Sequence, residues 1–458
     1  MQRKGKTLLI PFMPRRENLK PPRTLIIHVL CMESFGEPHT TLITDLFLHP
    51  KAEEIFIERQ VRALRGRVVL LTVSAGAGHD AVCGVLKEEW ESRGTECQVI
   101  DLFTCLPGSL KRFAPDLYLK MVRFTPFMWR AIYRRTDSPY KTLSPLLAPL
   151  WNEAVRRLKK AAPSMIIATH PLATAVADLS IRKCAFPEKP ALFSLVTDYS
   201  FHGMSLSREV TAVFLPDLDE VLRQQQAFPF ARFVHGCISI RSTWEAPVRR
   251  EELRRRMSLP VHAKVAAVSG GKEGLIPYKE VVRSFEKDTS GTWTLLCFTG
   301  ENTRAARQLE ALSTRHDVRV FPYTHTFADF VKAADVLISK PGGVTMTEAL
   351  AARIPVIITS PLPGQEEENA KRLKKHAFIR ESPAGETGRT AEQVLKDGIV
   401  LEDQVFISTK EMIDDMIRLK DEMQEKTRYA APEKGRILRM NHILAMRAKK
   451  EEEKQFRS

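Results

Sequence analysis

No apolar run in this 458-residue chain approaches the ~18 residues that a helix needs to cross a bilayer. The first residues, MQRKGKTLLIPFMPRR, have the basic flanks of a signal peptide, but their apolar part is short and is interrupted by Pro11 and Pro14. We therefore expect a soluble protein without a leader, in which any contact with a membrane is peripheral.

Cysteine is scarce and scattered. The cysteines are odd in number, contain no C-x-x-C pair, and stand at positions 31, 83, 97, 105, 184, 237 and 297. This pattern indicates reduced thiols in a cytosolic protein and argues against both a disulfide framework and a zinc site.

Two motifs of nucleotide chemistry are missing or weak. The chain has no GxxxxGK[ST], which excludes a P-loop nucleotide hydrolase. Its single D-x-D, Asp217-Leu218-Asp219, could hold a diphosphate through a metal, but it opens an apparent helix, where acidic residues are favoured by the helix dipole. We interpret it as structural and expect no metal and no cofactor. Helix N-termini, backbone N–H groups and cations would then have to stabilise the negative charge of a leaving diphosphate. Lys272 and Arg241 are candidate cations for this role.

Positive charge, by contrast, is plentiful. The net charge of +15 predicts attraction to polyanions, which could be nucleic acid, anionic lipid headgroups or a nucleotide-linked substrate. The apolar fraction of 43% and the charged fraction of 27% are ordinary for a globular protein. The length exceeds that of one compact core and predicts two domains.

From Arg67 onward, short apolar runs alternate with amphipathic helical stretches in two successive series. The first contains RVVLLTV, CQVIDLF, SMIIATH and ALFSLVTD. The second begins near Lys264 and contains KVAAVSGG, TWTLLCFTG, VRVFPYT, DVLISKPGG and IPVIITS. Such runs, separated by helices, predict parallel strands covered on both faces, and hence two doubly wound α/β domains. We expect an N-terminal extension at 1–65, a first domain at 66–240, a second domain at 241–400, and C-terminal helices with a charged tail at 401–458.

The loops that follow the apolar runs are rich in glycine, and ligands of open parallel sheets bind at these strand ends. In SKPGGVTMTEAL, Gly342 and Gly343 would begin a helix whose free N–H groups and dipole suit a phosphate. Glu348 could accept hydrogen bonds from the two hydroxyls of a ribose. The pattern Thr345-x-x-Glu348 also fits a capping box, in which the glutamate needs no ligand, and the spacing does not decide between them.

The turn PGQE, after the next apolar run, presents amide and carboxylate groups. Gln365, Glu366 and Asn369 are suited to the hydroxyls of a sugar. An ordinary Pro-Gly turn that opens a polar helix is the alternative.

Histidines follow three of the apolar runs. In SAGAGHD, Gly76 and Gly78 allow close approach of the backbone, and His79, with an ordinary pKa of ~6.5, could serve as a general base. A histidine that caps the next helix is the alternative. His202 is a second cleft candidate, while His170 fits a strand-to-turn junction better.

Residues 110–135 combine seven lysines or arginines with a dense set of aromatic and aliphatic residues. Basic helices with exposed aromatics bind anionic membrane surfaces. A pair of core-packing helices broken at Pro126 is the alternative. The candidate membrane contacts are Arg123, Phe124, Phe127, Met128, Trp129 and Arg130.

Several segments together resemble the monogalactosyldiacylglycerol synthase and processive diacylglycerol glucosyltransferase group of glycosyltransferase family 28. The resemblance runs from about Arg67 to Phe378. It is carried by GAGH, YLKMVRFTPFMWRAIYRRTD, TDYSFH, SGGKEG, and above all SKPGGVTMTEAL with PGQEEENA.

The resemblance implies a GT-B fold, with two Rossmann-like domains facing across a cleft. It also implies metal-independent, inverting transfer of a hexose from a UDP-sugar to diacylglycerol or a related lipid. The protein would be cytoplasmic, attached peripherally to the cytoplasmic face of an anionic membrane. His79 would be the catalytic base, and Gly76, Gly78, Asp198 and His202 would lie on the acceptor side. The implied donor-binding residues are Ser269, Gly270, Gly271, Phe327, Gly342, Gly343, Thr345, Glu348, Gln365, Glu366 and Asn369.

The chain departs from the family pattern at four positions. Ser205, Thr211 and Ser239 stand where relatives often have Trp, Asp and Pro, and Arg353 replaces a usual helix-ending glycine. These departures put the identity of the acceptor in doubt and allow a chain that has lost activity, such as an inactive sensor of UDP-sugars. The GT-B architecture also serves transferases to polyprenyl-linked acceptors and UDP-sugar epimerases, which are two further alternatives. A nucleic-acid-binding protein is a further alternative suggested by the charge, but no recognition motif supports it.

Overall fold

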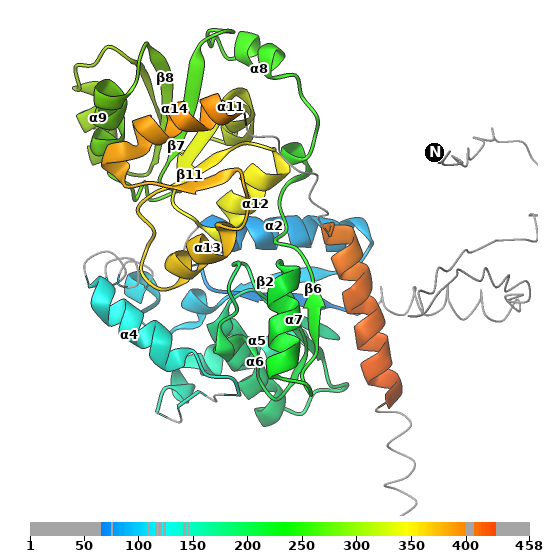
Figure 1. Ribbon diagram of the computed structural model, residues 1–458. Helices are drawn as coiled ribbons and strands as arrows, with labels where there is room; N and C mark the ends of the chain where they lie inside the picture. The colour runs from blue at the N-terminus through cyan, green and yellow to red at the C-terminus, as the bar shows by residue number, and fades with distance from the viewer. Residues whose placement is uncertain are drawn as a thin grey trace, which may run out of the picture. The chain divides into compact units, whose positions relative to one another are not determined.

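Two parallel sheets organise the part of the chain that the structure describes (Figure 1). This computed structural model describes residues 66–426 except 75, 76, 109, 115, 116, 118–120, 122–124, 141, 142, 145 and 399–406. The predicted N-terminal extension, Gly76, Arg123 and Phe124 lie outside the described residues. Residues 58–458 form one compact unit.

The first sheet has six parallel strands in the order β2-β1-β3-β4-β5-β6. The strands are β1 (Val68–Thr72), β2 (Cys97–Asp101), β3 (Met165–Ala168), β4 (Ala191–Leu195), β5 (Val210–Leu215) and β6 (Phe233–His235). The sequence predicted the first four; β5 and the short β6 were missed. β1 is buried throughout, as the continuous apolar run VVLLT requires of a strand covered on both faces.

The helices of this half are α2 (Ala77–Ser92), α4 (Pro126–Thr136), α5 (Asn152–Ala161), α6 (Pro171–Lys183) and α7 (Leu218–Ala227), with 3₁₀ turns η1 (Leu102–Cys105), η2 (Ala148–Trp151) and η3 (Gly203–Ser205). The D-x-D motif opens α7: Asp217 caps the helix by accepting from the Asp219 N–H, and Lys375 pairs with both carboxylates.

The second sheet has the strand order β12-β11-β10-β7-β8-β9. Its strands are β7 (Lys264–Ser269), β8 (Trp293–Gly300), β9 (Asp317–Pro322), β10 (Val336–Ser339), β11 (Val356–Ile358) and β12 (Ile379–Glu381). All but β12 were predicted. The accompanying helices and turns are η4 (Ser242–Trp244), α8 (Arg250–Arg256), α9 (Tyr278–Asp288), α10 (Thr303–Glu310), α11 (Phe327–Ala333), α12 (Gly343–Ala351), α13 (Gln365–Leu373), η5 (Ala384–Glu386) and α14 (Thr387–Asp397).

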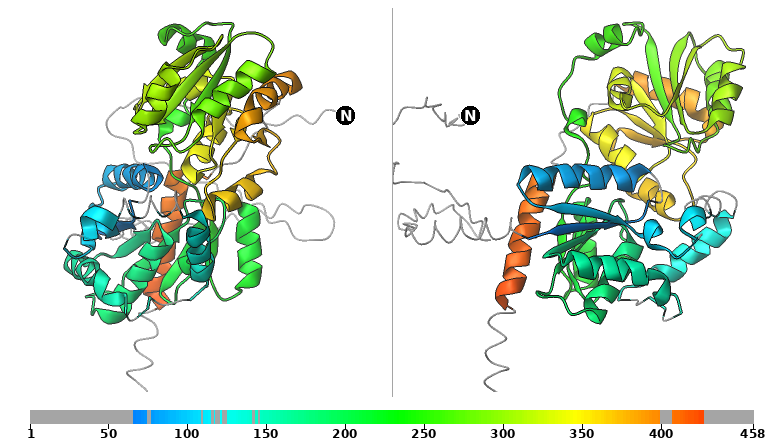
Figure 2. Two further views of the ribbon diagram at one scale, coloured as in Figure 1. Left: turned by 90° about the vertical axis from the view of Figure 1, so that its left-hand side faces the viewer. Right: turned by 180° about the vertical axis from the view of Figure 1, so that it is seen from behind.

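A helix over residues 409–426 returns to the first sheet (Figure 2). Met412 is buried and its sulfur accepts the Cys237 N–H, while Glu422 pairs with Arg232 and Asp414 with Arg93. The last described helix therefore packs against the half of the protein that contains the first sheet.

Two doubly wound parallel sheets that share a cleft are the GT-B arrangement, so the predicted fold class is confirmed. No helix within the described residues is long and apolar enough to cross a bilayer.

Candidate active site

The strand order of each sheet reverses at one point, and these two points define the candidate site. In the first sheet the chain leaves β1 for β2 and then returns to β3 on the other side of β1. In the second sheet the same reversal separates β7 from β10. Crevices at such points are the usual ligand sites of open α/β sheets. The loops that end these strands carry His79, His170, the SGGKEG segment and SKPGG.

A cavity of about 340 Å³ joins the two reversal points, and residues from both halves line it. The halves approach closely where α12 begins. A Cβ at Gly343 would lie 2.1 Å from the Thr197 carbonyl oxygen, so only glycine fits. Gly343 was predicted to face a diphosphate; here its missing side chain lets α12 approach the first domain. α12 also contacts α2.

His79 is half-buried in the cavity wall near the start of α2. Its Nδ1 lies 3.3 Å from Thr197 Oγ1, and its ring meets that of His170 edge-on at 5.2 Å. Burial lowers the pKa of His79, and the neighbouring Asp198 carboxylate partly opposes that shift. The imidazole is therefore neutral at pH 7. The ring also has a hydrogen bond to the backbone of Thr169. Because Nδ1 faces Thr197, Nε2 is the candidate nitrogen for a substrate proton.

Asp198 and Asn369 join the two halves. Asn369 donates to Asp198 Oδ1 at 2.8 Å and to the Pro341 carbonyl at 3.0 Å, and its Oδ1 accepts the Tyr199 N–H at 2.8 Å. Gln365 also donates to Asp198. Burial raises the pKa of Asp198, while these hydrogen bonds and the nearby His79 oppose the shift.

Asn369 is fully buried and does not line the cavity. Its oxygen and its amide nitrogen are already engaged by the protein, so in this arrangement the side chain does not reach a sugar. Tyr199 extends the same contact, because its hydroxyl lies 2.9 Å from Thr347 Oγ1 on α12. The segment TDY thus docks onto the start of α12 and α13.

We predict that Asn369→Ala destabilises the protein, because three buried partners lose their hydrogen bonds. The free energy of unfolding should fall by about 2–4 kcal/mol in denaturant titrations. Gln365→Ala, which removes one contact at the cavity edge, should cost much less. Unchanged stability of Asn369→Ala, with a raised KM for the donor, would instead favour the sugar-binding role predicted from the sequence.

The start of α12 resolves the ambiguity of Glu348. The helix begins at Gly343 with Gly342 as its N-cap, so Thr345 is already inside the first turn and cannot be the cap of a capping box. Glu348 lies in the second turn and lines the cavity. The Trp244 side chain hydrogen-bonds its carboxyl and Arg241 lies nearby, yet burial raises the pKa of Glu348 to about 8.

Lys340 and Glu366 form an ion pair in the cavity wall. Lys340 Nζ lies 2.7 Å from Glu366 Oε1, and both side chains are largely buried. The other oxygen of Glu366 accepts the Leu362 N–H at 2.8 Å. Lys340 also borders the SGGKEG loop, where a Cβ at Gly271 would lie 3.3 Å from its Cε. The cation stands beside the N-terminus of α12.

The described residues of the predicted membrane segment have different environments in the structure: some are exposed, one lines the cavity and one forms an ion pair with the second half. Phe127 and Met128 on α4 are exposed, 69% and 46% respectively. Trp129 points elsewhere and lines the cavity. Arg130 pairs with Glu367 of α13 at 2.5 Å, so this cation joins the two halves. Tyr133 packs against Gly364, whose φ of 85° suits glycine.

His202 stays away from the cavity. It is buried, its Nδ1 accepts the Met204 N–H at 3.3 Å, and its Nε2 lies 3.2 Å from the Tyr133 carbonyl. His170 caps α6 by accepting the Leu172 N–H at 3.1 Å, and burial lowers its pKa well below the ordinary value. Both imidazoles therefore hydrogen-bond the protein backbone, at Met204 and Tyr133 for His202 and at Leu172 for His170.

The structure brings most of the other predicted residues to one cavity. Those that line it are Gly78, His79, Trp129, Asp198, Ser269, Gly271, Phe327, Gly342, Gly343, Thr345, Glu348, Gln365 and Glu366, together with the suggested helpers Arg241 and Lys272. Gly270 lies behind the lining, with its N–H bonded to the Tyr278 hydroxyl.

Sequence reasoning missed Thr197, Trp244, Tyr323 and Lys340, which also line the cavity. Thr197 and Lys340 could have been found, since each belongs to a segment already singled out after a strand. Trp244 and Tyr323 carried no local signal. Trp244 packs edge-on against Phe327 at 5.8 Å between ring centroids.

We predict that Thr197 positions the catalytic candidate. Its hydroxyl lies 3.5 Å from the Thr169 carbonyl, to which it donates, and 3.3 Å from His79 Nδ1. Thr197→Val keeps the shape but loses the hydroxyl, and should lower kcat about tenfold. Thr197→Ser should restore it, with UDP affinity unchanged in both. Full activity of Thr197→Val, combined with a loss in Thr197→Ser, would assign Thr197 to packing alone.

Two family models match the chain, one for each half. The model described as monogalactosyldiacylglycerol (MGDG) synthase matches residues 79–227, and the glycosyltransferase family 28 C-terminal domain matches residues 265–388. Over both halves the chain is therefore similar to this branch of glycosyltransferase family 28.

Curated relatives span most of the length of this chain. A protein of Bacillus cereus (strain G9842) named processive diacylglycerol beta-glucosyltransferase is 26% identical over 77% of the chain and 87% of the relative. A protein of the same name from Bacillus thuringiensis (strain Al Hakam) is 25% identical over 82% of the chain and 94% of the relative.

Solved structures of similar arrangement are more distant. MurG of Acinetobacter baumannii is 14% identical, covering 72% of this chain and 91% of its own, with a TM-score of 0.49. Anabaena Alr3699/HepE in complex with UDP is 13% identical, covering 79% and 100%, with a TM-score of 0.44.

The structure shows the environment of each residue that departs from the family pattern. Arg353 adopts a φ of 54°, the region that favours glycine, directly after α12 ends. Thr211 accepts the Leu192 N–H and donates to Met423 of the returning helix. Ser205 is buried in η3, and Ser239 lines the cavity.

Proposed function

We propose that the chain transfers a hexose from a UDP-sugar to diacylglycerol or a similar lipid at a membrane surface. One observation carries this proposal. His79, whose lowered pKa keeps it neutral, and the N-terminus of α12 line the same cavity. A base for an acceptor hydroxyl then lies opposite a site for a leaving diphosphate. The matches to the two family models and the names of the curated relatives support the same reaction.

The donor would lie along the second-domain wall of the cavity. Phe327 borders the uracil, and Glu348 accepts hydrogen bonds from the ribose hydroxyls. The first N–H groups of α12 have no partner within the helix and face the diphosphate, with Lys340 beside them. Gln365 and Glu366 line the cavity, unlike Asn369, and would meet the hexose hydroxyls in addition to their contacts with Asp198 and Lys340.

The reaction would be a single displacement. The acceptor oxygen attacks the anomeric carbon while the bond from that carbon to the phosphate oxygen breaks. The hydroxyl proton passes to His79 Nε2, and UDP leaves with the electron pair. The developing charge is met by the α12 N-terminus and Lys340, without a metal or cofactor. Attack from the face opposite the leaving group inverts the anomeric configuration.

The acceptor would enter beside α4. Trp129 lines the cavity, whereas Phe127, Met128 and Ile132 on the same helix are exposed. Such a helix can insert its apolar residues among lipid headgroups and guide a lipid hydroxyl toward His79. We propose peripheral attachment to an anionic membrane at its cytoplasmic face.

Substituting Phe127 and Met128 by serine should weaken binding to anionic vesicles about tenfold or more, because each apolar insertion contributes on the order of 1–2 kcal/mol. Sedimentation with vesicles measures this. The matched control replaces Leu222 and Phe230, which are also exposed but lie on or just after α7. Equal weakening by the control would place the membrane contact elsewhere.

The proposal is tested by supplying labelled UDP-glucose, UDP-galactose or UDP-N-acetylglucosamine with vesicles that contain either diacylglycerol or a polyprenyl-linked acceptor. We expect label in glycosylated diacylglycerol. Label confined to the polyprenyl product would change the acceptor class. Conversion of the UDP-sugar without any acceptor would indicate an epimerase-like protein.

A further inference from the structure

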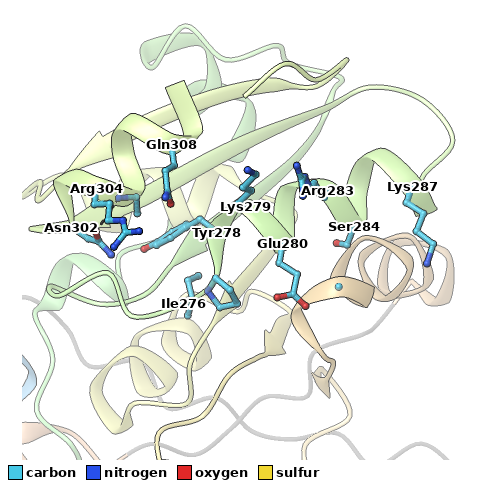
Figure 3. A pocket seen from close by; sticks show the side chains of 13 residues that line it. Ile276, Tyr278, Lys279, Glu280, Arg283, Ser284, Lys287, Asn302, Arg304 and Gln308 are labelled. Carbon is cyan, nitrogen blue, oxygen red and sulfur yellow. Dashed lines mark hydrogen bonds between the residues drawn. The ribbon is translucent and has the colours of Figure 1, made fainter. Parts of the chain in front are cut away.

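A second, larger cavity lies on the second domain, between α9 and α10 (Figure 3). It measures about 620 Å³ and shares no lining residue with the candidate active site. Its wall carries four cations and one carboxylate, Glu280. Figure 3 shows Arg304 at one end and Lys287 at the other, with Lys279 and Arg283 between them.

The cations form an extended row. Lys279, Arg283 and Lys287 recur every four residues, so they share one face of α9 and span about 12 Å of its axis. All are exposed, as is Arg304. Among the residues that the structure describes, no carboxylate lies within 4 Å of Lys279, Arg283 or Arg304, and Lys287 meets Asp288 only at 3.9 Å.

Two side chains that line this cavity, Tyr278 and Asn302, hydrogen-bond the loop Gly270–Gly274 of the candidate donor site. Tyr278 is buried, and its hydroxyl accepts the Gly270 N–H at 2.8 Å while donating to the Phe298 carbonyl. Asn302 donates to the Gly274 carbonyl at 3.0 Å. These two side chains therefore fix both ends of the loop Gly270–Gly274. The other face of that loop, including Gly271 and Lys272, lines the candidate active site.

We propose that this cavity binds a phosphate-bearing anion and that its occupancy is linked to the donor site through Tyr278 and Asn302. Guanidinium and ammonium groups without counter-ions are the groups that recognise phosphate, and a row of them suits a ligand with several charges. The anion comes either from a lipid headgroup or from a soluble organic phosphate. An anion that orders Tyr278 and Asn302 also orders the loop, so donor binding becomes tighter. This linkage rests on the proposed function; the anion site itself does not.

The test compares the full-length chain with a variant that carries Lys279→Gln, Arg283→Gln and Arg304→Gln. The matched control carries Arg307→Gln, Arg389→Gln and Lys396→Gln, which removes the same charge from exposed positions outside the cavity. The soluble probe is inorganic tripolyphosphate, titrated calorimetrically with UDP in excess to occupy the donor site. The membrane probe is phosphatidylcholine vesicles that contain phosphatidic acid.

We expect the cavity variant to bind at least one probe about tenfold more weakly than wild type, and the control to bind within about twofold. The responding probe identifies the source of the anion. Equal behaviour of the two variants with both probes overturns the site.

Linkage is measured as UDP affinity with and without the responding probe. We expect tightening of about fivefold in wild type and none in the cavity variant. Unchanged affinity in wild type overturns the linkage. Failure of wild type to bind UDP at all, with probe binding intact, would instead count against the proposed function.

Discussion

Substitution of Glu348 by alanine should weaken UDP binding about a hundredfold. The carboxyl lies in the second turn of α12 and lines the cavity, where the capping-box explanation no longer applies. Two hydrogen bonds from ribose hydroxyls to a carboxylate contribute about 1.5–3 kcal/mol each. Calorimetric titration with UDP measures the loss. Unchanged affinity would show that the ribose lies elsewhere.

The raised pKa of Glu348, about 8, adds a signature in pH. The free carboxyl is largely protonated at pH 7, whereas hydroxyl donors favour its ionised form. Binding of UDP should therefore release a proton near pH 7, and affinity should rise with pH and level off above about 8. Titrations in buffers of different ionisation enthalpy report the proton. Glu348→Gln should abolish both the release and the pH dependence.

Substitution of His79 by alanine should lower turnover by about a hundredfold to ten-thousandfold, the range that a general base supplies, while UDP affinity stays unchanged. The structure supports this separation, because His79 belongs to the first domain and the donor wall to the second. Since burial lowers the pKa of His79, kcat measured at saturating UDP-sugar should stay level from pH 7 down to below 6.5 before it falls.

The matched control for His79 is His202→Gln. His202 is buried outside the cavity, and both of its ring nitrogens have partners. This variant should lose stability but keep turnover at a temperature where it stays folded. Retained turnover in His79→Ala, combined with loss in His202→Gln, would reverse the two roles.

Local patterns predicted the strands that are long and apolar, such as β1 and β8, and the glycine loops that follow them. They missed β6 (FVH) and β12 (IRE), which are three residues long and contain polar residues. β11 is equally short, but its residues are all apolar and lie in the longer run IPVIITS, which made it recognisable. β5 (VTAVFL) was missed although its run is largely apolar.

The residues at the boundary between the two halves were the hardest to interpret. Asn369 and Gly343 were assigned to ligand, but their partners are Asp198 and Thr197, about 150 or more positions away in sequence. Arg130 was assigned to a membrane and pairs with Glu367. A polar side chain facing a sugar and one facing another domain have the same residue type and the same local spacing. Only the folded chain separates them.

The central claim is a single displacement of UDP by a lipid hydroxyl without a metal. It is tested most directly by offering each of the three UDP-sugars with diacylglycerol vesicles in the presence of a chelator, then determining the anomeric configuration of the lipid product by NMR. We expect a β-linked glycolipid from an α-linked donor, formed at an undiminished rate. An α-linked product, or loss of activity on chelation, would contradict it.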